Sequence, residues 1–393
     1  MTLTLPIEEI SSWIRLSLEP GLGPAQARHL LKEIGLPSTI YATSTRGLTK
    51  FLPAQLAQQL RQSPDDKVQE TIARTLAWLD GEEHHLVTLG DPSYPDSLLT
   101  IHDPPLLLYV HGRLHHLAQP AISIVGSRSA TAGGLDNARA FARHLAQEGW
   151  CIISGLASGI DTAAHEGALQ AGPDRGSTVA ILGTGIDIVY PARNRALAHQ
   201  IAEHGALVSE FPLGTRAIPY QFPKRNRLVA GMSRGVLVVE AAKQSGSLIT
   251  ARLASEMGRE VFAIPGSIHS PLSRGCHALI RQGAKLVESA EDIRDELGTP
   301  TRLPQPPSDA QRSTAGQPGA REAGPQETMA LAAPSPDDAV GFQILQALGY
   351  DPVALDTLHD RTRLDVATLG GRLMEMELQG LVVRQDDGRF MRR

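Results

Sequence analysis

Residues 121–165 read AISIVGSRSATAGGLDNARAFARHLAQEGWCIISGLASGIDTAAH, and this stretch decides the fold. An apolar run ends at Gly126-Ser127-Arg128, an amphipathic segment follows, and a second apolar run ends at Ser154-Gly155. Short β-branched runs that are bounded by glycine and separated by a helical period are typical of a βαβ unit with parallel strands. The stretch therefore predicts a parallel sheet whose strands end in small polar residues.

The same alternation of apolar and amphipathic segments continues along the chain. Strands are predicted at Leu106–Val110, Ile122–Val125, Cys151–Ile153, Val179–Leu182, Ala206–Val208, Val236–Val239, Val261–Ile264 and briefly near Leu286. Strands that alternate with helices indicate a doubly wound, Rossmann-like α/β domain. The prolines within residues 86–105 cannot lie inside a central strand, so we expect that segment to cover the sheet.

Composition divides the chain into four segments. Residues 1–80 have helical periodicity, and residues 81–298 hold the Rossmann-like pattern. Residues 299–338 repeat Pro, Gly, Ser, Gln and Thr without an aromatic residue, which predicts a flexible linker. In residues 339–393, three helical patterns precede a hairpin pattern with an Asp387-Gly388 turn, which predicts a winged helix.

The N-terminal segment contains a Gly-x-Gly-Pro turn at residues 21–24 that leads into an amphipathic helix. This resembles a SAM or helix-hairpin-helix module, whose turn can present backbone N–H groups to a DNA phosphate. A plain helix start with proline near its first position is the alternative. Glu19 and Glu33 flank the turn, so both interpretations remain open.

The overall composition limits the classes of partner. A net charge of −5 over 393 residues argues against a uniformly basic coat, so any nucleic-acid site must be a local basic patch. Two cysteines provide no disulfide framework. The N-terminus lacks a signal-peptide pattern, and no apolar run approaches a membrane span. We therefore expect a cytoplasmic protein.

Familiar cofactor motifs are missing from the sequence. There is no Gly-Lys dipeptide for a P-loop, no strand is followed by G-x-G-x-x-G, and paired Cys/His spacings are absent. We expect neither a cofactor nor a metal. What remains is a set of Gly/Ser turns after predicted strands: residues 126–128, 154–155, 183–185 and 245–247. One such turn is usually only a tight turn, but four at one sheet edge favour an anionic ligand.

The sharpest local feature is FPKRNRLVAGMSRG, residues 222–235. Asn226 lies between Arg225 and Arg227, a row that suits a backbone phosphate and a base edge. Phe222 offers a platform for stacking one base. A solvated basic face is the alternative interpretation.

Several acidic residues are candidates for chemistry. Asp161 and His165 are four residues apart and share a predicted helix face, but no nucleophile or metal partner accompanies them, so a structural pair is favoured. Glu240 and Glu210 each follow a buried strand and suit either a ligand contact or a structural anchor.

Seven motifs in order resemble the bacterial DNA-processing protein A family, DprA or Smf. They are IVGSRSAT (124–131), SGLASGIDTAAHEGAL (154–169), LGTGIDIVYPARN (182–194), SEFPLG (209–214), FPKRNRLVAGMS (222–233), EAAKQSGSLITA (240–251) and the PGSI…GCHALI…GA run (265–284). The resemblance covers about residues 90–290. Two positions depart from it: Ser158 stands where the family often has arginine, and His277 where asparagine is common.

The resemblance implies a single-stranded DNA binder that is not an enzyme. Such proteins form homodimers through the Rossmann-like domain. They load RecA recombinase onto DNA coated by single-strand-binding protein during natural transformation. The implied contacts fall on the GSR turn and the FPxRNR segment. Combined with the Gly/Ser turns, the candidate DNA-binding residues are Gly126, Ser127, Arg128, Gly155, Gly185, Phe222, Lys224, Arg225, Asn226, Arg227, Ser245 and Gly246.

Two other classes of function remain as alternatives. A Rossmann-like hydrolase of the N-glycosidic bond of nucleoside monophosphates would carry a PGGxGT-type run, which is missing. A transcription regulator would read duplex DNA with the helix near residues 365–378. That helix has three acidic residues against Arg372 and would repel phosphate, although the following wing carries Arg384, Arg389, Arg392 and Arg393. We therefore expect a protein-interaction or auxiliary role for the winged helix.

Overall fold

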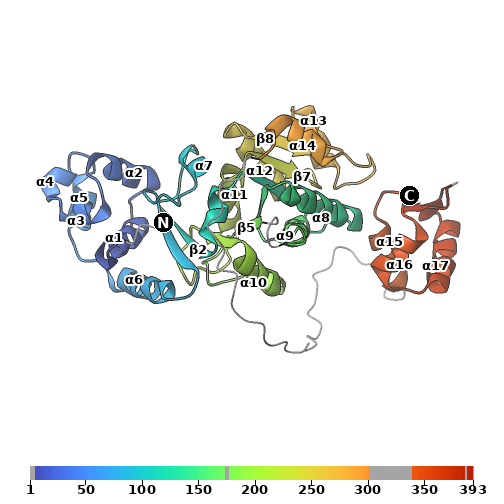
Figure 1. Ribbon diagram of the computed structural model, residues 1–393, viewed down its shortest axis with the longest axis horizontal. Coiled ribbons are helices and arrows are strands. Elements are labelled where there is room, and N and C mark those ends of the chain that lie inside the picture. The colour runs from blue at the N-terminus through green and yellow to red at the C-terminus, as the bar shows by residue number, and fades with distance from the viewer. Residues whose placement is uncertain (1–4, 173–176, 301–338, 386, 393) are drawn as a thin grey trace. The chain divides into compact units, whose positions relative to one another are not determined.

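The computed structural model describes residues 5–172, 177–300, 339–385 and 387–392. They form two compact units, one with the N-terminal helices and a large sheet and one at the C-terminus (Figure 1). Most of the predicted linker, residues 301–338, lies outside the described residues. No helix in the described ranges is long and apolar enough to cross a membrane.

A nine-stranded sheet forms the centre of the larger unit, in the order β1-β2-β6-β5-β4-β3-β7-β8-β9. The strands are β1 His84–Thr88, β2 Leu107–Gly112, β3 Ala121–Val125, β4 Cys151–Ser154, β5 Ser177–Ile181, β6 Ala206–Ser209, β7 Gly235–Val238, β8 Glu260–Ala263 and β9 Lys285–Leu286. From β6 to β9 all neighbours are parallel, whereas β1–β2 and β2–β6 are antiparallel. The predicted α/β fold is confirmed, with an antiparallel edge added.

We predicted that the segment upstream of β2 only covers the sheet, but part of it forms a strand of the sheet. Residues 84–88 form the edge strand β1, which pairs with β2 from His84↔His111 to Thr88↔Leu107. The prolines all follow β1, and they lie around the short helix α7, Asp96–Leu99. An edge strand pairs on one side only, so it tolerates the polar HHLVT sequence.

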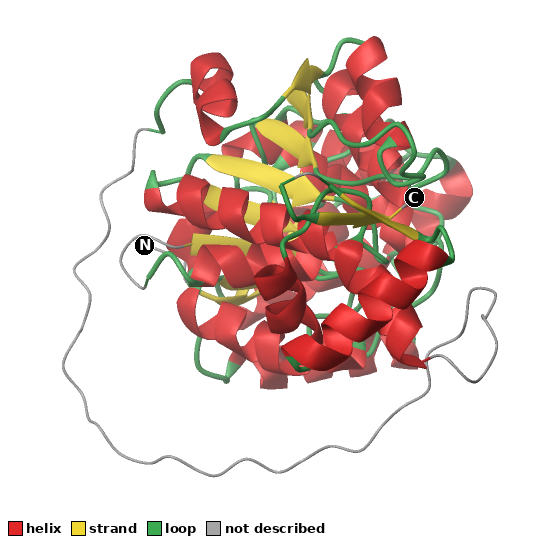
Figure 2. Cartoon of the chain, turned by 90° about the vertical axis from the view of Figure 1, so that its right-hand side faces the viewer, coloured by secondary structure: helices red, strands yellow, loops and turns green. Residues whose placement is uncertain are grey.

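Helices cover both faces of the sheet (Figure 2). One face packs against α8 Ala132–Gln147, α9 Ile160–Leu169, α10 Arg195–His204 and α14 Ala290–Leu297, and the other against α7, α11 Gln221–Gly231, α12 Gly246–Glu256 and α13 Arg274–Arg281. Because side chains alternate along a strand, Ile122 and Ile124 of β3 join the α8 side while Val125 joins the α11 side.

The strand order reverses between β3 and β7, which lie side by side at the centre. The chain leaves β3 toward α8 on one face and leaves β7 toward α12 on the other. Their connecting turns therefore separate and open a crevice at the carboxyl ends of the strands. In open α/β sheets, ligands bind at such a switch point.

The N-terminal helices share an apolar core with the sheet. They are α1 Ile7–Leu18, α2 Pro24–Glu33, α3 Pro37–Ala42, α4 Thr45–Leu48, α5 Ala54–Leu60 and α6 Asp66–Leu79. Trp13 and Leu30 belong to the same buried cluster as Tyr109 of β2 and Leu207 of β6. Arg28 of α2 also donates to Asp103 at 2.8 Å. The residues assigned from sequence to a helical domain thus pack as one body with the Rossmann-like core.

The C-terminal unit has three helices and a hairpin. Its elements are α15 Ala339–Leu348, α16 Leu355–Thr362, α17 Val366–Leu378, β10 Val382–Arg384 and β11 Phe390–Arg392. Ile344, Leu358 and Leu373, one from each helix, are fully buried together. Asp365 accepts a hydrogen bond from the Thr368 N–H at 2.9 Å and so begins α17 at the residue predicted.

Candidate nucleic-acid interface

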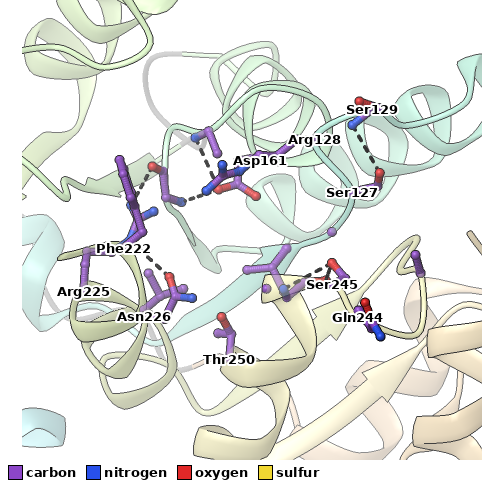
Figure 3. Close-up of a pocket in the computed structure, with 18 residues that line it drawn as sticks. Ser127, Arg128, Ser129, Asp161, Phe222, Arg225, Asn226, Gln244, Ser245 and Thr250 are labelled. Carbon is purple, nitrogen blue, oxygen red and sulfur yellow. Dashed lines mark hydrogen bonds between the residues drawn. The ribbon is translucent and has the colours of Figure 1, made fainter. Parts of the chain in front are cut away.

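A pocket of about 470 Å³ lies at the switch point of the sheet. Three turns and α11 surround it, and Figure 3 shows Phe222, Arg225 and Asn226 on one side with Ser127 and Ser245 on the other. Most of the candidates named from sequence line it: Gly126, Ser127, Arg128, Gly155, Phe222, Arg225, Asn226, Ser245 and Gly246. The prediction that these separate motifs meet at one sheet edge is confirmed. Their role in DNA binding stays a prediction.

The turn after β3 presents a cation at the mouth of this pocket. Arg128 is exposed, and its Cζ lies 5.5 Å from the centroid of the half-buried Phe222 ring. Its guanidinium forms no ion pair with any residue that the structure describes. Ser127 accepts a hydrogen bond from the Ser129 N–H through its hydroxyl, at 3.2 Å, which fixes the turn. Arg128 is thus free to meet an anion beside an aromatic face.

The turn after β7 lies on the other side of the pocket and begins α12. Ser245 is the N-cap residue, and its hydroxyl oxygen accepts from the Ser247 N–H at 3.3 Å. A Cβ at Gly246 would meet no atom within 4 Å, so the backbone there faces open space. A helix start with an accessible N–H stabilises an anion through its unpaired donors and its dipole.

Arg225 belongs to the buried part of the pocket wall rather than to its mouth. The side chain is 3% exposed, and its Nη1 donates to the Gly155 carbonyl at 2.5 Å and to the Ile181 carbonyl. Burial lowers the pKa of Arg225 to about 10, against the opposing pull of Asp161. Two of its guanidinium nitrogens, Nη1 and Nε, therefore donate inside the protein. The geometry assigns it to holding the ends of β4 and β5 in place.

The loop after β4 is closed by Asp161, the first-turn acid of α9. Its carboxylate accepts hydrogen bonds from the Gly155 N–H at 3.1 Å and the Ala157 N–H at 3.3 Å. Leu156 between them has a φ of 56°, a conformation that burial and these two bonds impose. Burial raises the pKa of Asp161, while Arg225 and these N–H groups lower it. The N–H groups that the sequence offered to a phosphate here are thus already bonded.

Arg227 and Lys224 are outside the pocket. Arg227 pairs with Glu210, whose side chain is only 5% exposed, and donates to the Asp103 carbonyl at 2.7 Å. Lys224 is 48% exposed at its side chain and lies 3.9 Å from the same Glu210 carboxylate. Burial raises the pKa of Glu210, and Arg227 lowers it. Glu210 is therefore a structural anchor, and Lys224 is the more accessible cation of this pair.

The loop after β5 places a residue other than the predicted one beside the pocket residue Phe222. Gly185 donates its N–H to the Thr215 carbonyl at 2.9 Å and is not among the lining residues. Further along the same loop, Tyr190 is 50% exposed, and its ring centroid is 5.6 Å from that of Phe222. Sequence reasoning missed Tyr190, although an aromatic residue in a loop at the carboxyl edge of the sheet was the available signal.

The remaining acid–base candidates have internal roles. Thr178 donates its hydroxyl to the Ile152 carbonyl, so it accepts from the His165 Nδ1–H at 2.7 Å. Burial, with Arg225 nearby, lowers the pKa of His165 to about 3. The carboxylate of Glu240 lies against the start of α8. A Cβ placed on Gly134 of that helix would be 2.4 Å from the carboxyl carbon of Glu240. The structural interpretation of these residues fits the geometry.

Comparison with known proteins places this chain in one family. The family model of DNA recombination-mediator protein A matches residues 85–298, and the DprA winged helix domain model matches residues 327–388. The chain belongs to the DNA recombination-mediator protein A family, as the motifs predicted. Its general function is DNA processing in recombination.

Individual relatives of known name support the same family assignment. Protein Smf of Escherichia coli is 40% identical over 321 residues, which are 81% of this chain and 80% of that protein. DNA processing protein DprA of Streptococcus pneumoniae is 47% identical over 207 residues, or 53% of this chain and 72% of that protein. The X-ray structure of the latter protein matches with a TM-score of 0.63 and 35% identity, covering 73% of this chain and 97% of that one.

Proposed function

We propose that the switch-point pocket binds single-stranded DNA without reading its sequence. The observation that carries this proposal is the exposed Arg128 guanidinium beside the half-buried Phe222 ring. The cation suits a backbone phosphate and the ring suits the face of a base. In a duplex the neighbouring pairs cover the base faces, so the ring selects unpaired bases. Every base has such a face, so binding is insensitive to sequence.

Fluorescence anisotropy of a short labelled oligonucleotide, single-stranded against duplex over a salt series, tests this proposal. We expect preference for the single strand, affinity that falls with salt, and loss of binding in Arg128→Ala. Arg143→Ala is the matched control, because Arg143 is an exposed arginine of α8 that does not line the pocket. Equal binding to duplex, or normal binding by Arg128→Ala, would contradict the proposal.

The same protein, we propose, passes its DNA to RecA recombinase on strands coated by single-strand-binding protein, in natural transformation. Family membership and the C-terminal unit support this step. On α17, Met374 and Leu378 are 67% and 86% exposed and lie four residues apart, so they share one face of the helix. Acidic residues accompany them, so this helix suits a protein partner better than phosphate. Arg393 of the predicted basic wing lies outside the described residues.

RecA-dependent strand exchange on coated single strands measures this activity. A Met374→Glu/Leu378→Glu variant of the full chain is expected to bind DNA normally and to stimulate exchange less than wild type. Normal stimulation by this variant would remove α17 from the RecA contact.

We also propose a homodimer through the sheet-containing unit, acting in the cytoplasm. Leu286 on the edge strand β9 and Ile268 before α13 are 43% and 74% exposed, which is consistent with an apolar contact at this edge. Light scattering of the full chain gives the mass directly. A monomer at micromolar concentration would contradict the dimer.

Finally, we propose that the protein is not an enzyme. Asp161 is the carboxylate that lines the pocket, and it already accepts two N–H groups. Glu240, the acid named for a nucleoside monophosphate hydrolase, is directed to the start of α8. Turnover of nucleoside monophosphates that Glu240→Gln abolishes would support the hydrolase instead.

A further inference from the structure

A second hollow, of about 350 Å³, lies on the opposite side of the Ser127–Ser129 turn from the first pocket. Arg128 and Ser129 line both. The other walls come from α8, α9 and the end of the loop that connects β5 to α10. Its lining residues are Arg128, Ser129, Ala130, Leu135, Arg139, Ser158, Gly159, Thr162, Ala163, Arg193 and Asn194.

The wall between the two hollows is built from two turns in close contact. The Ile160 N–H donates to the Ser127 carbonyl at 3.1 Å. A Cβ at Gly159, whose φ is 78°, would lie 2.2 Å from that same carbonyl oxygen. Only glycine permits this approach. The backbone of Arg128, a residue that both hollows share, is therefore held in place by these contacts.

Arg193 is placed on the far wall by its neighbour Asn194. The Asn194 side chain is 5% exposed and donates through Nδ2 to the Leu156 carbonyl and to the Thr162 hydroxyl, both at 2.9 Å. These bonds fix the end of the β5–α10 loop onto the start of α9. Arg193 is exposed next to this anchor. An exposed side chain on an anchored backbone is a common arrangement in binding sites.

The charge in the hollow is positive. Arg139 pairs with Glu166 at 2.8 Å and with Asp136 at 3.5 Å, so its charge is largely balanced. Arg128 and Arg193 form no ion pair with any other part of the chain that the structure describes. Neither Asp nor Glu is among the lining residues, while Ser129 and Ser158 add hydroxyl donors. The hollow therefore suits an anion that can accept hydrogen bonds.

We propose that this hollow binds a second DNA phosphate through Arg193. This phosphate is the neighbour, along the strand, of the phosphate bound at the first pocket. The proposal rests on the proposed single-stranded DNA function. Because Arg128 lines both hollows, a strand that crosses the turn presents successive phosphates to the two sides of one guanidinium. Arg193 then receives the phosphate that has passed over the wall.

Anisotropy of a labelled oligothymidylate over a salt series tests the assignment in the full chain. Loss of one phosphate contact on a single strand lowers the slope of log K against log salt by about 0.7. We expect this change in Arg193→Ala, with a roughly fivefold weaker affinity, the size of one exposed ion pair. Arg193→Lys keeps the charge and is expected to retain the slope. The matched control is Arg195→Ala, an exposed arginine two residues away that does not line the hollow.

The outcomes separate this inference from the function on which it rests. If Arg128→Ala loses binding while Arg193→Ala keeps both slope and affinity, the second subsite is wrong and the first pocket stands. If wild type fails to prefer single strands, the proposed function itself fails. A further experiment adds inorganic phosphate, at matched ionic strength, as a competitor of the labelled oligothymidylate. Competition that Arg193→Ala abolishes without a change in oligothymidylate binding would mean a free-phosphate site and would overturn the DNA assignment.

Discussion

The guanidinium of Arg225 lies directly against the backbone of Gly155, and its Nη1 donates to the Gly155 carbonyl at 2.5 Å. A Cβ at residue 155 would lie 2.5 Å from the Arg225 Nη2. The SGL loop therefore takes its position from a buried cation that reaches it from α11. This contact joins two motifs that are 70 residues apart.

Gly155→Ala is expected to displace Arg225 and to break its bonds to two strand ends. Overpacking of this kind costs about 1–3 kcal/mol, so urea unfolding should show a lower free energy of unfolding. Single-stranded DNA affinity should fall with it, because Asp161 and Phe222 line the same pocket. The control is Gly246→Ala in the same pocket, where the added methyl group meets open space at the start of a helix. That variant should unfold at the same urea concentration or higher.

Arg227→Met is expected to act through stability. It leaves the Glu210 carboxylate, 5% exposed, without its principal partner, which costs about 3–5 kcal/mol for a buried charge. Adding Glu210→Gln should recover part of the loss, which a double-mutant cycle in urea measures. Lys224→Met, at an exposed position of the same helix, should leave stability unchanged. An Arg227→Met protein of wild-type stability would contradict the structural role.

Phe222→Leu is expected to weaken single-stranded DNA binding without unfolding the protein. Stacking of one base on an aromatic ring contributes about 1–3 kcal/mol, so the affinity should fall about fivefold to a hundredfold. Phe222→Tyr keeps the ring face and should bind nearly as wild type does. Phe342→Leu, which removes a 49% exposed ring from α15, serves as the aromatic control. If Phe222→Leu binds like wild type, the ring is not a stacking platform.

Acid should destabilise the protein through His165. Burial holds its folded-state pKa at about 3, below the unfolded value of 6.5, so the unfolded chain binds the extra proton between these values. This contribution is complete above pH 6.5 and is lost as the pH falls toward 3. It amounts to about 2 kcal/mol between pH 7.5 and pH 5. Urea unfolding at the two pH values gives the loss in the free energy of unfolding between them. This loss should be smaller in His165→Gln than in wild type, and the same as in wild type in His269→Gln, which replaces an exposed residue.

The sequence was sufficient for the strands from β2 to β9 and for the meeting of the motifs, but not for the edge strand β1. The central strands β3, β4 and β5 each have an apolar core and a Gly/Ser end, and parallel strands bring those ends to one edge. It was not sufficient for the cations of residues 222–227. Arg225 stands three and four residues before Leu228 and Val229, both buried, so helical spacing places it on the sheet-facing side of α11. That spacing was the signal that it is buried.

The contribution of the β5–α10 loop was harder to predict. Its path depends on Asn194, which is anchored to Leu156 and Thr162 from distant parts of the chain. No local pattern reveals such long-range bonds. Arg193 thus gains its position from tertiary structure alone, whereas Gly185, the residue that the pattern favoured, only shapes the turn.

The buried cluster that joins Trp13 and Leu30 to Tyr109 and Leu207 has a consequence for how the chain melts. An apolar core shared by the N-terminal helices and the sheet makes them a single cooperative unit, because neither part can open without exposing the other's interior to water. Calorimetry should therefore give one heat-absorption peak for both. A chain shortened to begin at β1 would expose that apolar surface and, in a cell, become a target for chaperones and proteases.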